Sequence, residues 1–331
     1  MSRTMDGVTA GAVGLLLGVW LDRTVADPPR FHPVAGFGQL AERYERRWYA
    51  DHEAAGALYA LVLVGGAAAV TRSAERALPP AGRLALRALV TAVALGGTSL
   101  RRAARTMAEL LRAGDLDAAR DQLGWLCGRD PSRLDADGLA RATVESVAEN
   151  TSDAVVGTLA WGAVFGATGV VVHRTVNTLD AMVGYRTSRH LRFGRVAART
   201  DDLINLAPAR LTALLTVVLA PTVGGRPTDA WRVWRRDAAG HPSPNAGPVE
   251  AAAAGALGLT LGGDVNHYGD HQDRRPAMGE GPSPRIDDID RAAALSSALE
   301  LAAVTVAFAA AIGVAVARGR HVEVRAEGAR S

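Results

Sequence analysis

The sequence predicts an all-α fold, a polytopic integral membrane helical bundle with a polar helical insert. Hydrophobic residues make up 48% of the 331-residue chain and charged residues 21%, yet the apolar residues are concentrated in blocks without charge. Several of these blocks are long enough to cross, as helices, the roughly 30 Å hydrocarbon core of a bilayer. The chain also lacks the regular alternation of strands and helices that would indicate an α/β enzyme.

The apolar blocks set the expected membrane segments. In chain order they are 7–21, 54–70, 84–100, 155–172, 211–223, 248–261 and 292–317. The first block is short for a span, but no convincing cleavage site follows it, so we expect an uncleaved membrane helix. Pro79 and Pro80 break any helix between the second and third blocks, which predicts two membrane helices joined by a short loop. The blocks 211–223 and 248–261 are short enough to be re-entrant or buried helices.

The polar segment at about 101–154 predicts a helical insert within a single membrane-embedded domain covering 1–331. A break at Gly114 and Asp115 separates its first two helices, and either Ser132 or Asp135 is the candidate N-cap for the third. We expect this insert to be cytoplasmic. Independently, the basic tail from Arg318 onward predicts a cytoplasmic C-terminus.

Composition excludes several functional classes. The net charge is +3, no long basic run is present and aromatic residues are only 5%, so no nucleic-acid partner is expected. The single cysteine, Cys127, allows neither an intrachain disulfide nor a cysteine-based zinc cluster. The sequence contains no GxxxxGK[ST] loop, no GxGxxG motif after a strand and no HExxH motif.

Two groups of carboxylates and carboxamides flank the uncharged run 155–172. The first group comprises Glu145, Glu149, Asn150 and Asp153, and the second comprises Asn177, Asp180, Tyr185, Asp201, Asp202 and Asn205. The acids of the first group lie four residues apart and therefore share one helix face. A solvated acidic stripe would show the same spacing. Acids this close to apolar segments are costly unless they hold a cation, which favours a metal or phosphate-handling site near a membrane.

The run between these groups poses a topological problem. If 155–172 crossed the bilayer, the two groups would face opposite compartments and could not form one site. Either the run is re-entrant or buried, or the two groups meet within the membrane. The sequence leaves these alternatives open.

A further polar stretch, HPSPNAG at 241–247, contains two prolines and a glycine, which predicts a rigid turn. The turn would present His241, Ser243 and Asn245 at fixed positions just before Glu250 and an Ala/Gly-rich helix. A structured loop that only connects two helices is the alternative interpretation.

Taken in order, seven motifs resemble the CobD/CbiB family of cobalamin biosynthesis, and together they cover about residues 17–291. They are Asp27-Pro28 with His32-Pro33-Val34; Gly128-Arg129-Asp130; VESVAENT at 144–151 with Asp153; VNTLD at 176–180 with MVGY at 182–185; Asp201-Asp202 with Asn205 and PARL at 208–211; His241 with SPN at 243–245; and Glu250 with AGALG at 254–258 and LGG at 261–263. Ala154 and Thr158 replace the family's usual Gly and Pro, and Leu206 replaces an aromatic residue.

The resemblance implies a multi-pass enzyme of the cell (inner) membrane, adenosylcobinamide-phosphate synthase, with its active site facing the cytoplasm. This ATP-dependent amide ligase joins the carboxylate of adenosylcobyric acid to (R)-1-amino-2-propanol or its O-phosphate. The resemblance also implies Mg²⁺ as cofactor, ATP as co-substrate and membrane lipid as surroundings. A homo-oligomer and contacts with later membrane enzymes of the cobalamin pathway are compatible with it.

On this resemblance, each site residue receives an expected role. The expected Mg²⁺ ligands are Glu145, Glu149, Asn150, Asp153, Asp201 and Asp202, because oxygen ligands suit that cation. The expected ATP or substrate contacts are Arg129, Asn177, Tyr185, Arg210, Ser243 and Asn245, with the two arginines as phosphate donors. The expected catalytic residues are His32, His241 and Asp180; either histidine could take a proton from the attacking ammonium.

Two other functions remain open at this stage. A UbiA-like, Mg²⁺-dependent membrane prenyltransferase would also use acid-rich motifs in a helical bundle, but it would act without ATP and leave the HPSPN stretch unexplained. A non-catalytic, AmpE-like membrane sensor would lack the paired acid groups found here.

Overall fold

The structure, a computed structural model, describes residues 2–27, 32–185, 187–263, 265–268 and 271–328; Pro28 of the first motif lies outside them. The described chain is almost entirely helical, as predicted. The helices are α1 (Ser2–Val25), α2 (Pro33–Trp48), α3 (Glu53–Ala77), α4 (Pro80–Leu95), α5 (Gly97–Ala113), α6 (Leu116–Leu123), α7 (Ala136–Asn150), the π-helical turn η1 (Thr151–Gly157), α8 (Thr158–Val183), α9 (Arg195–Leu219), η2 (Ala220–Val223), α10 (Pro227–Asp237), η3 (Ala238–Gly240), α11 (Ala246–Leu257) and α12 (Ile286–Gly328).

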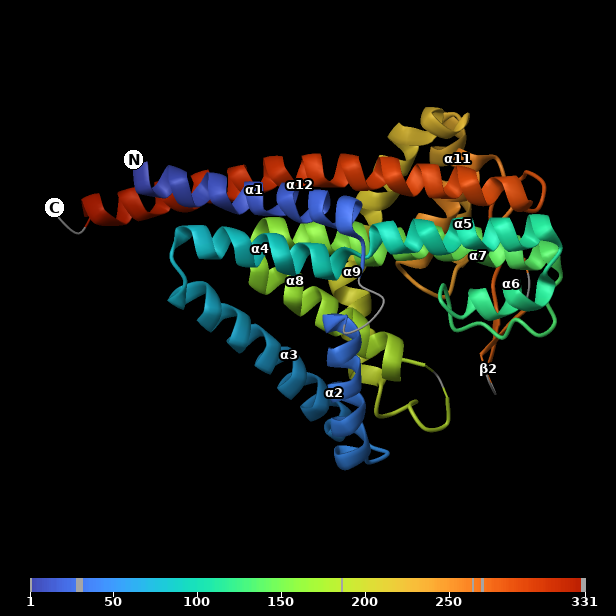
Figure 1. The fold of residues 1–331 in the computed structure, drawn as a ribbon, viewed down its shortest axis with the longest axis horizontal. Helices are drawn as coiled ribbons and strands as arrows, with labels where there is room; N and C mark the ends of the chain where they lie inside the picture. The colour runs from blue at the N-terminus through green and yellow to red at the C-terminus, as the bar shows by residue number, and fades with distance from the viewer. Residues whose placement is uncertain (1, 28–31, 186, 264, 269–270, 329–331) are drawn as a thin grey trace.

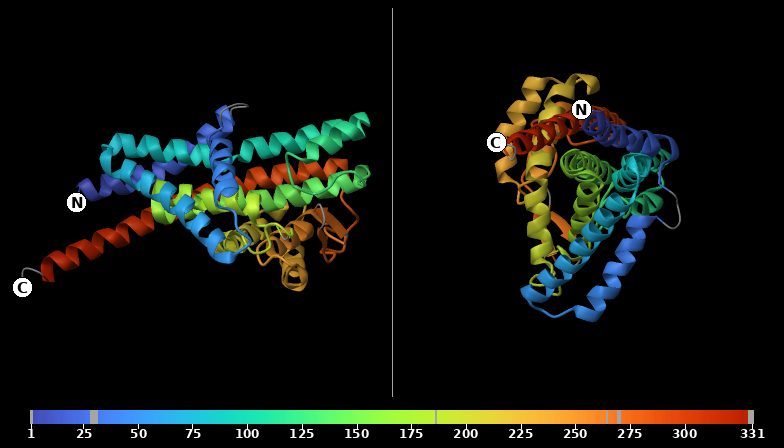
Figure 2. Two further views of the ribbon diagram at one scale, coloured as in Figure 1. Left: turned by 90° about the horizontal axis from the view of Figure 1, so that it is seen from below. Right: turned by 90° about the vertical axis from the view of Figure 1, so that its left-hand side faces the viewer.

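The bundle is elongated, and both chain termini lie at one end of it (Figure 1). Helices α1, α4, α5, α7 and α12 run along the long axis, whereas α2 and α3 cross it obliquely. The view down that axis shows α9 along one side of the bundle and α3 crossing toward its lower end (Figure 2). Helix α1 packs along both α4 and α12, so the expected first membrane segment is one of the helices of the bundle.

Five helical stretches are long and apolar enough to cross a membrane. They are Glu53–Ala77, Pro80–Ala113, Ala136–Val183, Arg195–Val223 and Ile286–Ala317. Large hydrophobic side chains are exposed on α1, α3, α4, α8, α9 and α12, where lipid would cover them. Within 101–154, Trp125 is the one large hydrophobic residue that is exposed. These surfaces identify a membrane protein and agree with a polar segment outside the lipid.

The polar segment 101–154 shares its core with later helices. It forms α5, α6, α7 and the start of η1. The predicted break at Gly114 is present, and of the two candidate caps Asp135, not Ser132, caps α7. Met107 and Leu139 belong to the same buried cluster as Leu257 of α11 and Ile289 of α12. The segment is therefore a continuation of the bundle helices and has no separate core.

Helix α8 reverses direction at Gly166. This glycine has φ 69° and ψ −151°, a conformation that is essentially restricted to glycine. A Cβ atom added to Gly169 would lie 2.3 Å from the carbonyl oxygen of Trp161. In a continuous helix these two residues would be about 12 Å apart along the axis. The outgoing limb (158–165) and the returning limb (167–183) therefore form a helical hairpin, so the run 155–172 is re-entrant.

Of the two short apolar blocks, 211–223 and 248–261, only the second forms the kind of helix that was expected. The block 211–223 was expected to be a short re-entrant or buried helix, but it forms the second half of the 25-residue α9 and the turn η2. For the block 248–261 the alternatives were a re-entrant helix and a buried helix. Helix α11 is buried at every residue, which agrees with the second.

The polar region 264–290 contains a short antiparallel hairpin that the sequence did not predict. Strands β1 (Val265–Tyr268) and β2 (His271–Arg274) pair with Val265 opposite Arg274 and Tyr268 opposite His271. In sequence the hairpin lies between Leu261 and Met278, which form an isolated antiparallel bridge. It lies at the same end of the molecule as α6 (Figure 1).

The C-terminal helix separates two parts of the chain that were both expected in the cytoplasm. Its first turns lie beside the 101–154 segment, and its last turns lie at the end that carries both termini (Figure 1). The apolar part of α12, up to Ala317, lies between them. A cytoplasmic insert and a cytoplasmic C-terminus therefore cannot both be right if this part crosses the membrane.

Candidate functional site

The helical hairpin brings the two acid groups together. Glu149 at the end of α7, Asp153 in η1, Asp180 on the returning limb and Asp201 on α9 lie within electrostatic range of one another. Their convergence depends on the reversal at Gly166, because the returning limb carries Asp180 back toward η1. A π-helical turn such as η1 is frequent at functional sites, where it redirects a side chain.

Among the described residues, the four acids have no basic side chain in direct contact. Within the described residues, the side chains of Glu149, Asp153 and Asp180 form no ion pair shorter than 4 Å. Asp201 is 8% exposed and lies beside the amides of Asn177 and Asn205, but its Oδ1 atom has no hydrogen-bond partner. Burying such carboxylates is costly unless a cation compensates them, so this cluster fits a cation-binding role.

The cluster does not form an all-protein metal cage. Among the described residues, no three His, Cys, Asp or Glu side chains are gathered tightly enough to hold a metal ion. Mg²⁺ usually keeps several waters and binds one or two carboxylates together with the phosphates of a substrate. A magnesium ion in this cluster would therefore need a phosphate-bearing ligand to complete its coordination.

Glu145 is separated from the other acids by its partners. Its Oε2 atom accepts a 2.6 Å hydrogen bond from the Nη2 of Arg129, and its Oε1 atom accepts one of 2.7 Å from the N–H of Gly262. Both side chains of this ion pair are almost fully buried. Glu145 thus connects α7 to the GRD turn and to the LGG motif. It was expected to bind magnesium together with Glu149 and Asp153, but it does not join them in one site.

His241 and Glu250 lie in a second buried polar group. The Nη1 of Arg275 donates to Glu250 Oε1 at 2.9 Å, and His241 Nε2 lies 3.9 Å from the same oxygen. Burial raises the pKa of Glu250 well above its ordinary value, and the Arg275 guanidinium opposes this only in part. Glu149 lies within electrostatic range of Glu250 as well as of the acid cluster.

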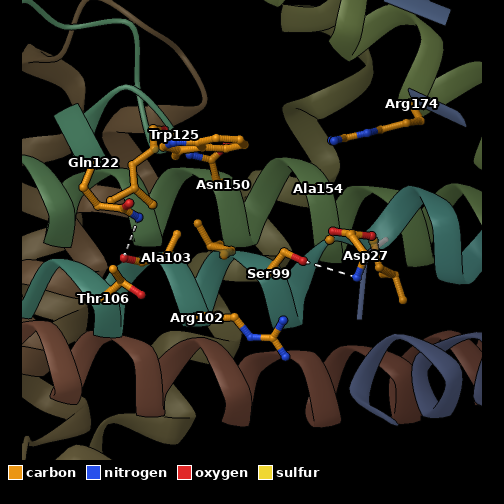
Figure 3. Close-up of a pocket in the computed structure, with 14 residues that line it drawn as sticks. Asp27, Ser99, Arg102, Ala103, Thr106, Gln122, Trp125, Asn150, Ala154 and Arg174 are labelled. Atoms are coloured by element: carbon orange, nitrogen blue, oxygen red, sulfur yellow. Dashed lines mark hydrogen bonds between the residues drawn. The ribbon is translucent and has the colours of Figure 1, made fainter. Parts of the chain in front are cut away.

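A polar cavity of about 370 Å³ opens beside the acid cluster, between α5, the α6–α7 connection and α8. Its lining includes Asp27, Arg102, Trp125, Asn150 and Arg174 (Figure 3). Asn150 donates to the carbonyl oxygens of Leu126 and Ser146, so the amide is held at the cavity wall.

Comparison with known proteins decides the family. The sequence profile described as "CobD/Cbib protein" matches residues 15–296. The chain is 49% identical over 296 residues to the "Cobalamin biosynthesis protein CobD" of Mycobacterium tuberculosis, covering 89% of this chain and 94% of that protein. It is 44% identical over 291 residues to the protein of the same name from Chromobacterium violaceum, covering 86% and 91%. The chain belongs to the CobD/CbiB family. No solved structure matches it.

In this CobD/CbiB chain, several other predicted site residues hold the polypeptide together. Asn245 accepts a 3.0 Å hydrogen bond from the Nη1 of Arg210 and donates to the carbonyl oxygen of Asp202 at 2.8 Å. The hydroxyl of Ser243 accepts the N–H groups of Asn245 and Ala246 at the start of α11. The HPSPN turn is thereby fixed against α9, beside Asp201.

The remaining two predicted site residues, His32 and Tyr185, lie at the edges of the CobD/CbiB site. His32 Nε2 is 3.0 Å from Asp27 Oδ1, and its Nδ1 accepts the N–H of Val34 at the start of α2. The hydroxyl of Tyr185 would lie 3.0 Å from a Cβ atom added to Gly128, so Tyr185 covers the GRD turn.

Arg174 is the residue that the sequence analysis missed. It lies between the cavity and the acids: it lines the cavity, donates to Asn177 Oδ1 at 3.1 Å and is within electrostatic range of Asp153. Its position two residues before the VNTLD motif was a usable signal. Trp125 and Arg102 also line the cavity, but only the fold reveals them, because each occurs in a segment without a recognised motif.

Proposed function

We propose that this CobD/CbiB protein is adenosylcobinamide-phosphate synthase, an ATP-dependent ligase that joins the carboxylate of adenosylcobyric acid to the amine of (R)-1-amino-2-propanol or its O-phosphate. The observation that carries the proposal is the convergence of Glu149, Asp153, Asp180 and Asp201 at the base of a re-entrant hairpin. The curated relatives are named as cobalamin biosynthesis proteins, which supports a corrinoid substrate.

The chemistry needs an activated carboxyl group. A carboxylate oxygen of the corrinoid attacks the terminal phosphorus of ATP, ADP leaves, and an acyl phosphate forms. The amine nitrogen then attacks the acyl carbon, inorganic phosphate leaves and the nitrogen loses a proton. Magnesium would be held by Asp153 and Asp201, with Glu149 nearby, and would neutralise charge on the phosphoryl oxygens.

A carboxylate is the best candidate for the proton acceptor. The Nδ1 lone pairs of His32 and His241 already accept backbone N–H groups, from Val34 and Ser243 respectively. In this conformation the Nδ1 atom of neither histidine is available to take a proton from the amine. Asp180 faces the cluster without an ion pair among the described residues, so we assign it this role.

The proposed use of ATP determines which end of the protein we place in the cytoplasm. The nucleotide is a cytoplasmic substrate, so the end with α6 and α7 faces the cytoplasm and the bundle lies in the inner membrane. The basic C-terminal tail then lies on the opposite side, and the prediction made from that tail alone is given up. The orientation agrees with the small exposed apolar surface of 101–154.

The test uses purified protein incubated with adenosylcobyric acid, Mg²⁺-ATP and each amine, with products identified by mass spectrometry. Asp201→Asn should lower amide formation by roughly 100-fold, the scale of losing one preorganised electrostatic contact to a reacting group. Asp117→Asn, at an exposed position on α6, is the matched control. Full activity of Asp201→Ala would remove the cluster from the mechanism. Turnover of a prenyl diphosphate without ATP would instead support the prenyltransferase alternative.

A further inference from the structure

The polar cavity has features that the amide-ligation proposal does not use. It has a volume of about 370 Å³, and its lining combines one aromatic ring with two arginines and several hydroxyl and amide groups. Trp125 and Arg174 lie on different sides of the cavity, and Arg102 projects from α5, below both of them in this view (Figure 3). A volume of this size is within the range of about 300–1,000 Å³ that is usual for small-ligand sites.

Trp125 is exposed although its backbone is fixed. Its side chain is 83% exposed, while the adjacent Leu126 carbonyl oxygen accepts a 2.6 Å hydrogen bond from the Ser146 hydroxyl. Gln122, one turn earlier, donates to the carbonyl oxygen of Ala103 on α5. The indole is thus held at the rim of the cavity with its ring uncovered, which suits stacking against a flat ring of a ligand.

Arg174 has more hydrogen-bonding capacity than the protein uses. Its Nη1 donates to Asn177, but its buried Nε has no hydrogen-bond partner. Among the described residues no carboxylate lies within 4 Å of its guanidinium, although Asp27 and Asp153 are within electrostatic range. A buried guanidinium without an ion pair is costly, and an anionic oxygen from a ligand would compensate it.

We infer that this cavity is the nucleotide site: the base stacks on Trp125, the phosphates lie between Arg102 and Arg174, and the last phosphate reaches the Asp153 end. The inference rests on the proposed function, because it places the ATP of that reaction. A corrinoid macrocycle is several times larger than a nucleotide and cannot be enclosed here. Its carboxylate would have to approach Arg174 from outside the cavity.

The experiment measures binding of Mg²⁺ with a non-hydrolysable ATP analogue, AMP-PNP, to the detergent-solubilised full-length protein by calorimetry. Trp125→Ala and Arg174→Gln should each raise the dissociation constant by about tenfold or more. Trp231→Ala, at an exposed tryptophan on α10, and Arg105→Gln, one turn from Arg102 on α5, are matched controls and should bind like the wild type. Trp125→Ala is the variant least exposed to folding defects, because its side chain packs little.

Each outcome separates the inference from the proposed function. If the wild type binds AMP-PNP and both variants bind it equally well, the nucleotide lies elsewhere and only the inference fails. If the variants lose affinity for adenosylcobyric acid and keep it for AMP-PNP, the anion at Arg174 is the corrinoid carboxylate, and the inference also fails. If the wild type neither binds nor consumes nucleotide, the proposed function itself fails.

Discussion

The Oε2 atom of Glu75, near the end of α3, accepts a 2.8 Å hydrogen bond from the hydroxyl of Thr168, at the start of the returning limb of α8. Its Oε1 atom accepts the N–H of Ala167 at 3.2 Å, and the Nη2 of Arg87 lies 3.9 Å from that oxygen. Glu75 therefore acts as an N-terminal cap supplied by another helix, and its negative charge suits the positive end of the helix dipole. The tip of the helical hairpin is held from α3 and α4.

Removing this cap should loosen the hairpin and, with it, the acid cluster. We expect Glu75→Ala to lower the free energy of unfolding by about 1 kcal/mol, the usual scale for losing a cap, and to reduce amide formation. Glu75→Gln keeps an acceptor oxygen and should fall between Glu75→Ala and the wild type. Thermal unfolding in detergent and the ligation assay measure both effects. Glu42→Ala, in an exposed pair with Arg46, should change neither, and an equal effect of both alanines would contradict the role of Glu75.

Glu145 should behave as a structural residue and not as a magnesium ligand. Glu145→Gln removes the carboxylate that pairs with the buried Arg129 guanidinium, so we expect a loss of about 3–5 kcal/mol in unfolding free energy. The Mg²⁺ concentration that gives half-maximal activity in the folded fraction should stay unchanged. The double variant Glu145→Gln with Arg129→Met should recover part of the stability. A variant with normal stability and a raised Mg²⁺ requirement would return Glu145 to the metal site.

Asp237 should make stability depend on acid pH. A hydrogen bond from Arg236 holds the pKa of its carboxyl below the ordinary value, and the N–H of Gly279 adds a second one of 2.8 Å. A lowered folded-state pKa contributes stability that is present above the unfolded value of about 3.9 and lost as pH falls through the folded value. The melting temperature of Asp237→Asn should thus be below that of the wild type at pH 7, and the gap should close as pH falls through the folded-state pKa. A gap that stays constant with pH would exclude this linkage.

The insert and the C-terminal tail should be accessible from opposite sides of the membrane. Burial raises the pKa of the Cys127 thiol, so it is a slow target, and Cys127→Ala provides a clean background. In that background, Ser132→Cys should react with a membrane-impermeant maleimide only in inverted vesicles. Gly319→Cys should react only in intact spheroplasts. Labelling of both positions in one preparation would show that α12 does not cross the bilayer.

Local chemistry made much of the fold predictable. Pro79 and Pro80 separate α3 from α4, Gly114 ends α5, and Asp135, one of the two expected candidates, caps α7. These signals act within a few residues, so they do not depend on the rest of the structure. The full length of α9 was missed because its first half is polar and only its second half shows an apolar pattern.

The features that were not predictable depend on distant partners. Gly166 is one of several glycines in its block, and only its contacts with α3 and α4 distinguish it as the turning point. The acid cluster was foreseen as a set of residues, but the diversion of Glu145 to Arg129 depends on where the GRD turn packs. Arg174 gained its importance from a cavity formed by α5 and the α6–α7 connection, far away in sequence.

The left-handed conformation of a single glycine also decides how the chain should be counted across the bilayer. A hydropathy profile scores 155–172 as one crossing and would therefore invert the inferred side of everything that follows. With the reversal, the polypeptide emerges on the side from which it entered, and the parity of all downstream segments changes. Reporter fusions placed after Val183 should accordingly match fusions placed before Ala136, and disagree with a map drawn from hydrophobicity alone.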